Sequence, residues 1–185
     1  MALGLMIKIL AMSGSLRSKS SNTRLVKRVA DIAGDTFAID VFSDLHRLPH
    51  FNPDREPSED VFVKDLTRRM RDADGFLVST PEYAHGVPGT LKNALDWLVS
   101  TDAFIEKPFA LLHASDRSTH APQSLIEILT TMSGLHVAQA DVTIDLRRND
   151  EGAEAILLEE SNHAKIQGSL AILSQFMLER KSIKA

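Results

Sequence analysis

Short apolar runs alternate with longer segments of helical periodicity along the chain. Five runs are apolar or β-branched enough to predict strands: Met6–Met12, Thr36–Phe42, Gly75–Ser79, Phe109–Ala114 and His136–Ile144. Apolar residues that recur every three or four positions predict helices over Thr23–Ala33, Glu59–Arg71, Leu91–Val99, Pro122–Met132 and Glu151–Arg180. The alternation of strand and helix favours an α/β fold in which helices cover both faces of a parallel sheet.

The inward faces of two helices can be predicted from the same pattern. In the second helix the residues expected to face the core are Val61, Phe62, Leu66 and Met70. In the last helix they are Ile156, Leu157, Ile166, Leu170, Leu173, Phe176 and Met177. The alternating Thr36–Phe42 run is expected nearer a sheet edge, whereas the fully apolar Gly75–Ser79 run is expected in the centre.

Composition narrows the class of protein. A chain of 185 residues with no linker or repeat is expected to form a single domain over residues 1–185. The net charge of −4 argues against a nucleic-acid surface, and the absence of cysteine excludes thiol chemistry. The apolar start, Met1–Leu10, lacks the features of a signal peptide, and no run is long enough for a membrane helix. We therefore expect a cytoplasmic protein with no membrane or nucleic-acid partner.

The loop after the first predicted strand suits a phosphate group. Ser13–Asn22 supplies five serine hydroxyls, a glycine for a tight turn and the Arg17 guanidinium, and it leads directly into a helix. It matches neither the GxGxxG fingerprint nor the GxxxxGK[ST] loop. The alternative is a serine-rich turn in which Ser20 or Ser21 only caps the helix.

The loop after the third predicted strand reads TPEYAHGVPGTLKNALDW, from Thr80 to Trp97. In parallel sheets ligands bind beyond the carboxyl ends of the strands, so this loop is expected beside the first one. Glu82 could be a solvated acid or an inter-subunit partner, Tyr83 could simply cover the sheet end, and His85 could be an exposed loop histidine. Trp97 is expected to serve packing or an interface.

Together these two segments resemble the NAD(P)H-dependent FMN reductase family, which includes quinone, azo and chromate reductases. Gly14–Asn22 is similar to its G-S-L-R-x-x-S-x-N phosphate loop, and Thr80–Trp97 is similar to its T-P-E-Y-x-x-G/S-x-P-G-x-L-K-N-A-L-D-W segment. The resemblance also covers Leu48–Asp54. It implies a flavodoxin-like three-layer sandwich with a five-stranded parallel sheet in the order 2-1-3-4-5.

The resemblance also implies a cofactor and the residues that bind it. FMN is the expected cofactor, and NADPH or NADH is the expected electron donor. The resemblance also implies that the protein forms a homodimer or homotetramer. The predicted FMN-binding residues are Ser15, Arg17, Ser20, Ser21, Asn22, Pro81, Glu82, Tyr83, Ala84, Gly86, Ser115 and Arg117. No side chain is expected to be catalytic, since the flavin carries the chemistry. The seven histidines show no metal-ligand spacing, so no metal site is expected.

The match weakens after the fourth predicted strand. The family has a glycine-rich loop there, whereas this chain has His113–Leu125, which contains no glycine. Only Ser115 still matches, and the path of Asp116–His120 is expected to differ. As a hypothesis, Arg117 or His120 lies near the N1–O2 edge of the flavin and stabilises its reduced form.

The predicted function is an FMN-dependent oxidoreductase. Hydride would pass from NAD(P)H to FMN and on to a small-molecule acceptor such as a quinone, azo compound, metal oxyanion or free flavin, with ping-pong kinetics. One alternative is an FMN-binding electron carrier without nicotinamide activity. The other is a flavodoxin-like protein that has lost its flavin, which the glycine-free loop would explain.

Overall fold

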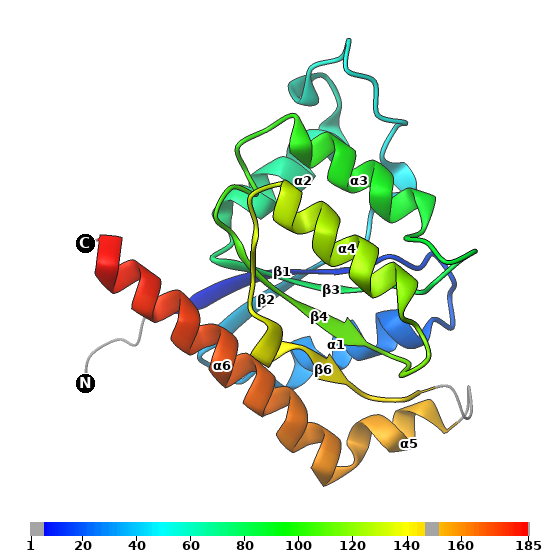
Figure 1. The fold of residues 1–185 in the computed structure, drawn as a ribbon, viewed down its shortest axis with the longest axis vertical. Coiled ribbons are helices and arrows are strands. Elements are labelled where there is room, and N and C mark those ends of the chain that lie inside the picture. The colour runs from blue at the N-terminus through cyan, green and yellow to red at the C-terminus, as the bar shows by residue number, and fades with distance from the viewer. Residues whose placement is uncertain (1–5, 147–151, 185) are drawn as a thin grey trace.

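A computed structural model describes residues 6–146 and 152–184 of the chain, and a parallel sheet runs through its centre (Figure 1). The strand order is β2-β1-β3-β4-β5, and β6 pairs with β4 beyond this path. The strands are β1 Ile7–Ser13, β2 Phe37–Phe42, β3 Gly75–Ser79, β4 Pro108–His113, β5 Leu135–His136 and β6 Val142–Thr143. The predicted strand order is confirmed, and β2 lies at an edge as its alternating pattern predicted.

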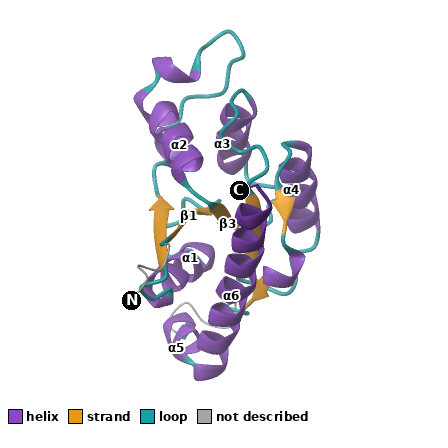
Figure 2. Cartoon of the chain, turned by 90° about the vertical axis from the view of Figure 1, so that its left-hand side faces the viewer, coloured by secondary structure: helices purple, strands orange, loops and turns teal. Residues whose placement is uncertain are grey.

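Helices cover both faces of the sheet, as the two views in Figures 1 and 2 show. One face carries α2 Val61–Asp72, α3 Gly89–Val99 and α4 His120–Thr131, and the other carries α1 Ser21–Ile32, α5 Ala153–Leu158 and α6 Glu160–Lys184. Short 3-10 turns occupy Leu45–Arg47, Pro57–Glu59 and Ala138–Ala140. The fold is therefore the three-layer sandwich that the sequence predicted.

The sheet separates two apolar cores because neighbouring side chains of a strand point to opposite faces. Leu10, Phe76 and Val78 belong to the core under α2, α3 and α4. Ile9 and Leu77 belong to the core under α1 and α6. This two-sided burial explains why β1 and β3 read as continuous apolar runs.

The predicted fifth strand, His136–Ile144, is interrupted in the structure. β5 pairs with the start of β4 and β6 with its end, and a 3-10 turn lies between them. Between these two pairings, a side chain replaces a backbone partner of β4: the Asp141 carboxylate accepts the Leu111 N–H at 2.7 Å. The prediction of one continuous strand is wrong because this side chain replaces backbone pairing.

Two helix predictions also need correction. The single helix expected over Glu151–Arg180 is two helices, because Glu159 has an extended ψ of 134° between α5 and α6. Asn162 stabilises this break by donating from Nδ2 to the Ile156 carbonyl at 2.9 Å. The start predicted at Glu151 lies outside the described residues. In α2, Val61 is 69% exposed rather than inward, since it is the first helical residue and Val63 faces the core instead.

Two glycines provide a matched stability test. A Cβ on Gly134 would lie 2.4 Å from Phe104 Cε1 and 2.8 Å from the Leu129 carbonyl oxygen, whereas one on Gly168 in α6 would meet nothing within 4 Å. Gly134→Ala is therefore expected to lower the free energy of unfolding by about 1–3 kcal/mol. Gly168→Ala should raise it by up to about 1 kcal/mol. Urea unfolding of both variants checks the pair, and equal effects of the same sign would contradict the packing described here.

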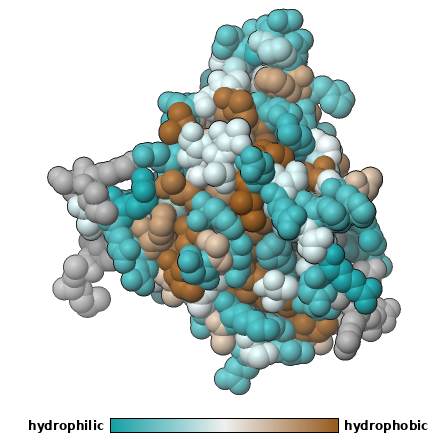
Figure 3. All heavy atoms as spheres, in the orientation of Figure 1, coloured by the Kyte–Doolittle hydropathy of each residue, from teal (hydrophilic) through white to brown (hydrophobic). Residues whose placement is uncertain are grey.

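Polar and apolar side chains are mixed on the side of the molecule that Figure 3 shows, where α3, α4 and α6 lie in Figure 1. Four large apolar side chains on or next to these helices are at least 40% exposed: Val99, Ile105, Ile172 and Leu178. Among the described residues, no helix is both long and apolar enough to cross a lipid bilayer.

Candidate functional site

A cavity of about 200 Å³ opens at the carboxyl ends of β1, β3 and β4. It is lined by Ser15, Arg17, Ser20, Ser21, Asn22, Thr80, Pro81, Glu82, Tyr83, His113, Ala114, Ser115 and Ser118. The loops after the first, third and fourth strands therefore meet here, as expected for a parallel sheet. Cavities that enclose whole small molecules usually measure about 300–1,000 Å³, so a larger ligand would be only partly enclosed.

The first loop is held against the end of β3 and presents a helix N-terminus. The Gly14 N–H donates to the Ser79 carbonyl at 2.8 Å. A Cβ on Gly14 would lie 2.9 Å from Leu91 Cδ2, so any larger residue here would force the Leu91 side chain to shift. Ser20 caps α1 by accepting the Thr23 N–H at 3.3 Å, as one of the two alternatives for this serine predicted. The first N–H groups of the helix then remain available to an anion.

Asn22 lines the cavity and also joins two elements of the site. Its Oδ1 accepts a hydrogen bond from the hydroxyl of Ser79 at 2.7 Å, and Ser79 is fully buried. Because the buried hydroxyl needs a partner, the start of α1 is fixed to the end of β3. The Ser15 hydroxyl similarly accepts the Arg17 N–H at 3.3 Å and shapes the turn.

Glu82 connects the loop after β3 with the start of α4. Its Oε2 accepts the Ala121 N–H at 3.0 Å and the His120 N–H at 2.9 Å. These two hydrogen bonds, from Ala121 first and then His120, lower the pKa of the Glu82 carboxyl below its ordinary value of 4.5. An anionic carboxylate therefore stabilises the helix start, a role that the sequence did not suggest.

Most of the predicted FMN-binding residues meet at this cavity. Those that line it are Ser15, Arg17, Ser20, Ser21, Asn22, Pro81, Glu82, Tyr83 and Ser115. Ala84, Gly86 and Arg117 were also predicted and lie outside its lining, in the loops that continue from Tyr83 and Ser115. Four further residues line the cavity but were not among the predicted FMN-binding residues: Thr80, His113, Ala114 and Ser118. His113 could have been predicted from its position at the carboxyl end of β4, since ligands bind at the carboxyl ends of the strands in such sheets.

His113, at the end of β4, gives the fold a measurable dependence on pH. Burial lowers its pKa below the usual 6.5; the Asp141 carboxylate opposes this effect, and His136 adds to it. The unfolded chain therefore binds the proton more readily, so stability should fall as pH drops below about 6.5. In His113→Gln this decline should be shallower. Urea unfolding of both proteins at about pH 7.5 and about pH 5.5 measures the difference, and parallel losses would contradict the assignment.

A second cavity of about 550 Å³ lies on the β2 side of the first loop. It shares Ser15 and Arg17 with the first cavity, and Lys27 and His46 add further cationic or titratable groups. The first loop thus separates two hollows, and Arg17 borders both.

The comparisons identify the family. The family model described as NADPH-dependent FMN reductase matches residues 7–148. The chain belongs to the NADPH-dependent FMN reductase family. An NAD(P)H-dependent FMN reductase of Pseudomonas aeruginosa is 30% identical over 179 residues, which cover 90% of this chain and 93% of that protein. The family resemblance predicted from the two loops is thereby confirmed.

Other relatives of the chain match over a shorter segment. A 2-hydroxy-1,4-benzoquinone reductase of a Burkholderia species is 40% identical over 91 residues, and the matched part spans about half (49%) of each chain. A quinone reductase of Escherichia coli is 33% identical over 94 residues, again half of each chain. The solved structure of FerB, a flavoenzyme NAD(P)H:(acceptor) oxidoreductase from Paracoccus denitrificans, has a TM-score of 0.80 at 23% identity and covers 94% of this chain and 98% of that one. This likeness confirms the fold.

Proposed function

We propose that this protein is an FMN-dependent oxidoreductase that takes electrons from NADPH or NADH and delivers them to a small-molecule acceptor. The supporting observation is the meeting of the Ser15–Asn22 loop and the Thr80–Tyr83 segment at one cavity. Membership of the FMN reductase family supports the cofactor. Bound FMN would supply the hydride chemistry, accepting it from a nicotinamide and releasing two electrons to the acceptor.

The residues of the cavity suit FMN in two parts. Arg17, the serine hydroxyls and the start of α1 would hold the phosphate, because they combine a guanidinium, hydroxyl donors and free helix N–H groups. Pro81 and Tyr83 would border the flavin ring, since they supply apolar surface next to polar backbone. Tyr83 is 54% exposed, which fits a ring site that stays open to a second reactant. Ala84, Gly86 and Arg117 would then lie at the rim.

Glu82 has a positioning role in this proposal. Its carboxylate ties the loop after β3 to α4, so that both walls of the cavity keep a fixed separation. The glycine-free segment Asp116–His120 is thus held at its end by Glu82 rather than by glycine turns. This supports a formed cavity despite the departure from the family pattern.

A quinone is the acceptor that we propose first, because two of the relatives above are named as quinone reductases. Initial rates measured with varied NADPH or NADH and varied benzoquinone test the proposal. Parallel double-reciprocal lines are expected, since the oxidised nicotinamide would leave the protein before the acceptor binds. Intersecting lines would contradict this order, and no nicotinamide oxidation by the FMN-loaded protein would favour an electron carrier instead.

We also propose that the protein forms a homodimer or homotetramer and acts in the cytoplasm without a membrane or nucleic-acid partner. The exposed apolar side chains Val99 and Ile105 near the end of α3, with Ile172 and Leu178 on α6, support a contact between copies. Light scattering at micromolar concentration should give the mass of two or four chains, and a monomer mass would contradict the proposal.

A further inference from the structure

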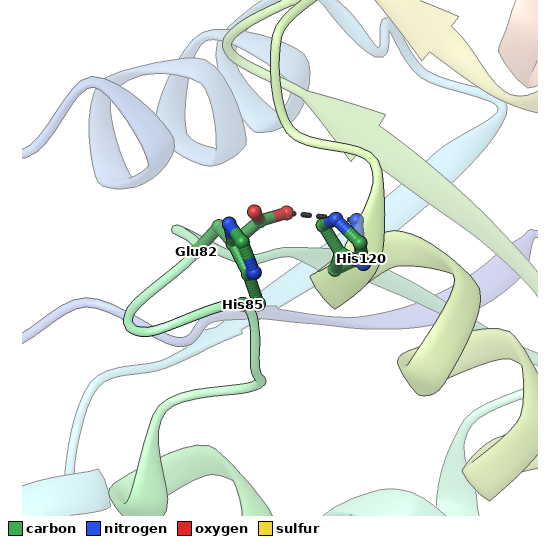
Figure 4. A group of neighbouring side chains, drawn as sticks. All are labelled: Glu82, His85 and His120. Atoms are coloured by element: carbon green, nitrogen blue, oxygen red, sulfur yellow. Dashed lines mark hydrogen bonds between the residues drawn. The ribbon is translucent and has the colours of Figure 1, made fainter.

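Two histidines and one carboxylate lie close together, as Figure 4 shows, and the carboxylate, Glu82, also lines the cavity. His85 comes from the loop after β3 and His120 is the first residue of α4. Their rings stack with centroids 4.2 Å apart and planes 21° apart. One ligand atom each from Glu82, His85 and His120 lie within 4.8 Å of one another. No sequence spacing predicts this group, because it joins two loops that are distant in the chain.

The backbone forms a tight turn at His85. Tyr83 and Gly86 exchange two backbone hydrogen bonds of 3.1 and 2.9 Å, which close a tight turn around Ala84 and His85. Both enclosed residues have positive φ, 49° and 60°, a region that non-glycine residues rarely adopt. Strained backbone of this kind is frequent where a side chain must be aimed at a ligand.

The donor set fits a late first-row divalent cation. Two imidazoles with a glutamate form one of the known zinc ligand sets, with a fourth position open to water. The His120 and Ala121 N–H groups both donate to Oε2, and Oε1 would serve the cation. Ligand atoms about 2.0–2.2 Å from a zinc ion lie roughly 3–3.6 Å from each other. The group would therefore need to contract by roughly 1 Å, which side-chain rotation of exposed histidines supplies.

Charge at this point does not prevent cation binding. The N-terminus of α4 carries a partial positive charge of about half an elementary charge, which disfavours a cation. Glu82 carries a full negative charge at the same place and is held there by the helix N–H groups. The local sum is negative, and the imidazole ring nitrogen is the commonest metal ligand among side chains.

We propose that Glu82, His85 and His120 form a binding site for a late first-row divalent cation, with Zn²⁺ as the expected occupant. The ion would link the loop after β3 to the start of α4, in addition to the hydrogen bonds that Glu82 already makes. The site shares Glu82 with the lining of the flavin cavity, but ion binding at it needs no flavin.

Equilibrium dialysis of Zn²⁺ against tag-free, chelator-treated, flavin-free protein tests the site. One ion per chain is expected, and Co²⁺ should give visible absorption bands of a nitrogen- and oxygen-ligated ion. His85→Asn keeps a residue that tolerates positive φ, and His120→Ala keeps the backbone N–H that Glu82 accepts. Each should weaken binding at least about tenfold, since even outer-shell changes typically cost 10–100-fold. His50 is an exposed histidine in another loop, so His50→Ala is the matched control. This variant should bind Zn²⁺ as tightly as the unmodified protein does.

Three results would overturn the proposal: no saturable binding, binding unchanged in both variants, or an equal loss in His50→Ala. Thermal unfolding of each variant in chelator shows whether it is folded, so a loss of binding can be separated from a loss of structure. Because the protein is free of flavin, the outcome is independent of whether the oxidoreductase proposal succeeds.

Discussion

Replacing Arg17 with alanine is expected to weaken FMN binding by about 10- to 100-fold and to leave riboflavin binding unchanged. Hydrogen bonds to charged groups contribute about 1.5–3 kcal/mol, and the two ligands differ only in the phosphate that Arg17 would contact. Arg17 lines the cavity together with the serines at the start of α1. Flavin fluorescence quenching with both ligands gives the two dissociation constants.

Lys19→Ala is the matched control for this prediction. Lys19 is an exposed cation of the same loop and does not line the cavity, so its removal changes the net charge equally. FMN affinity should change little in this variant, beyond a small loss that disappears as salt is added. Equal losses of FMN and riboflavin in Arg17→Ala would mean that the arginine shapes the loop and does not bind phosphate. Equal losses in both variants would indicate only a long-range charge effect.

Replacing Trp97 with alanine is expected to lower the free energy of unfolding by about 3–5 kcal/mol. The side chain lies on the inner face of α3 and is fully buried, and its ring packs edge-on against Phe51 with centroids 5.2 Å apart. Its Nε1 donates to the Pro49 carbonyl at 2.8 Å, and Asn93 Nδ2 donates to the same oxygen at 2.9 Å. Trp97 therefore attaches the long loop after β2 to the core, as well as filling volume.

Trp97→Phe separates packing from hydrogen bonding. It keeps most of the aromatic volume and loses the indole N–H, so its cost should be smaller, about 1–2 kcal/mol. The Pro49 carbonyl keeps its bond from Asn93, which limits that cost. Urea unfolding followed by circular dichroism is suitable because Trp97 is the only tryptophan and the variants lose its fluorescence. A loss below about 1 kcal/mol in Trp97→Ala would contradict the core position.

The strands and the loops at their carboxyl ends could be predicted because each rests on local signals. The apolar run Gly75–Ser79 is β3 in the structure, and the helix predicted over Leu91–Val99 is α3, which starts two residues earlier, after Pro88. Trp97 was expected to serve packing or an interface, and it is fully buried in the core. Such features depend on neighbouring residues, which a sequence shows directly.

The remaining features depend on contacts between distant residues. The interruption of the fifth strand follows from the hydrogen bond between Asp141 and Leu111, 30 positions earlier. The role of Glu82 follows from its contact with α4, 38 positions later. The stacked pair of His85 and His120 exists only because the third and fourth strand ends lie side by side. Periodicity and spacing contain none of this information.

The visible spectrum of the purified protein tests the central proposal most directly. The protein is mixed with excess FMN, freed of unbound flavin by gel filtration, and then titrated with NADPH or NADH without oxygen. We expect a yellow protein with about one flavin per chain, whose visible flavin absorption is lost after about one equivalent of nicotinamide, because hydride transfer carries two electrons. A colourless protein after gel filtration, or a yellow one that neither nicotinamide bleaches, would contradict it.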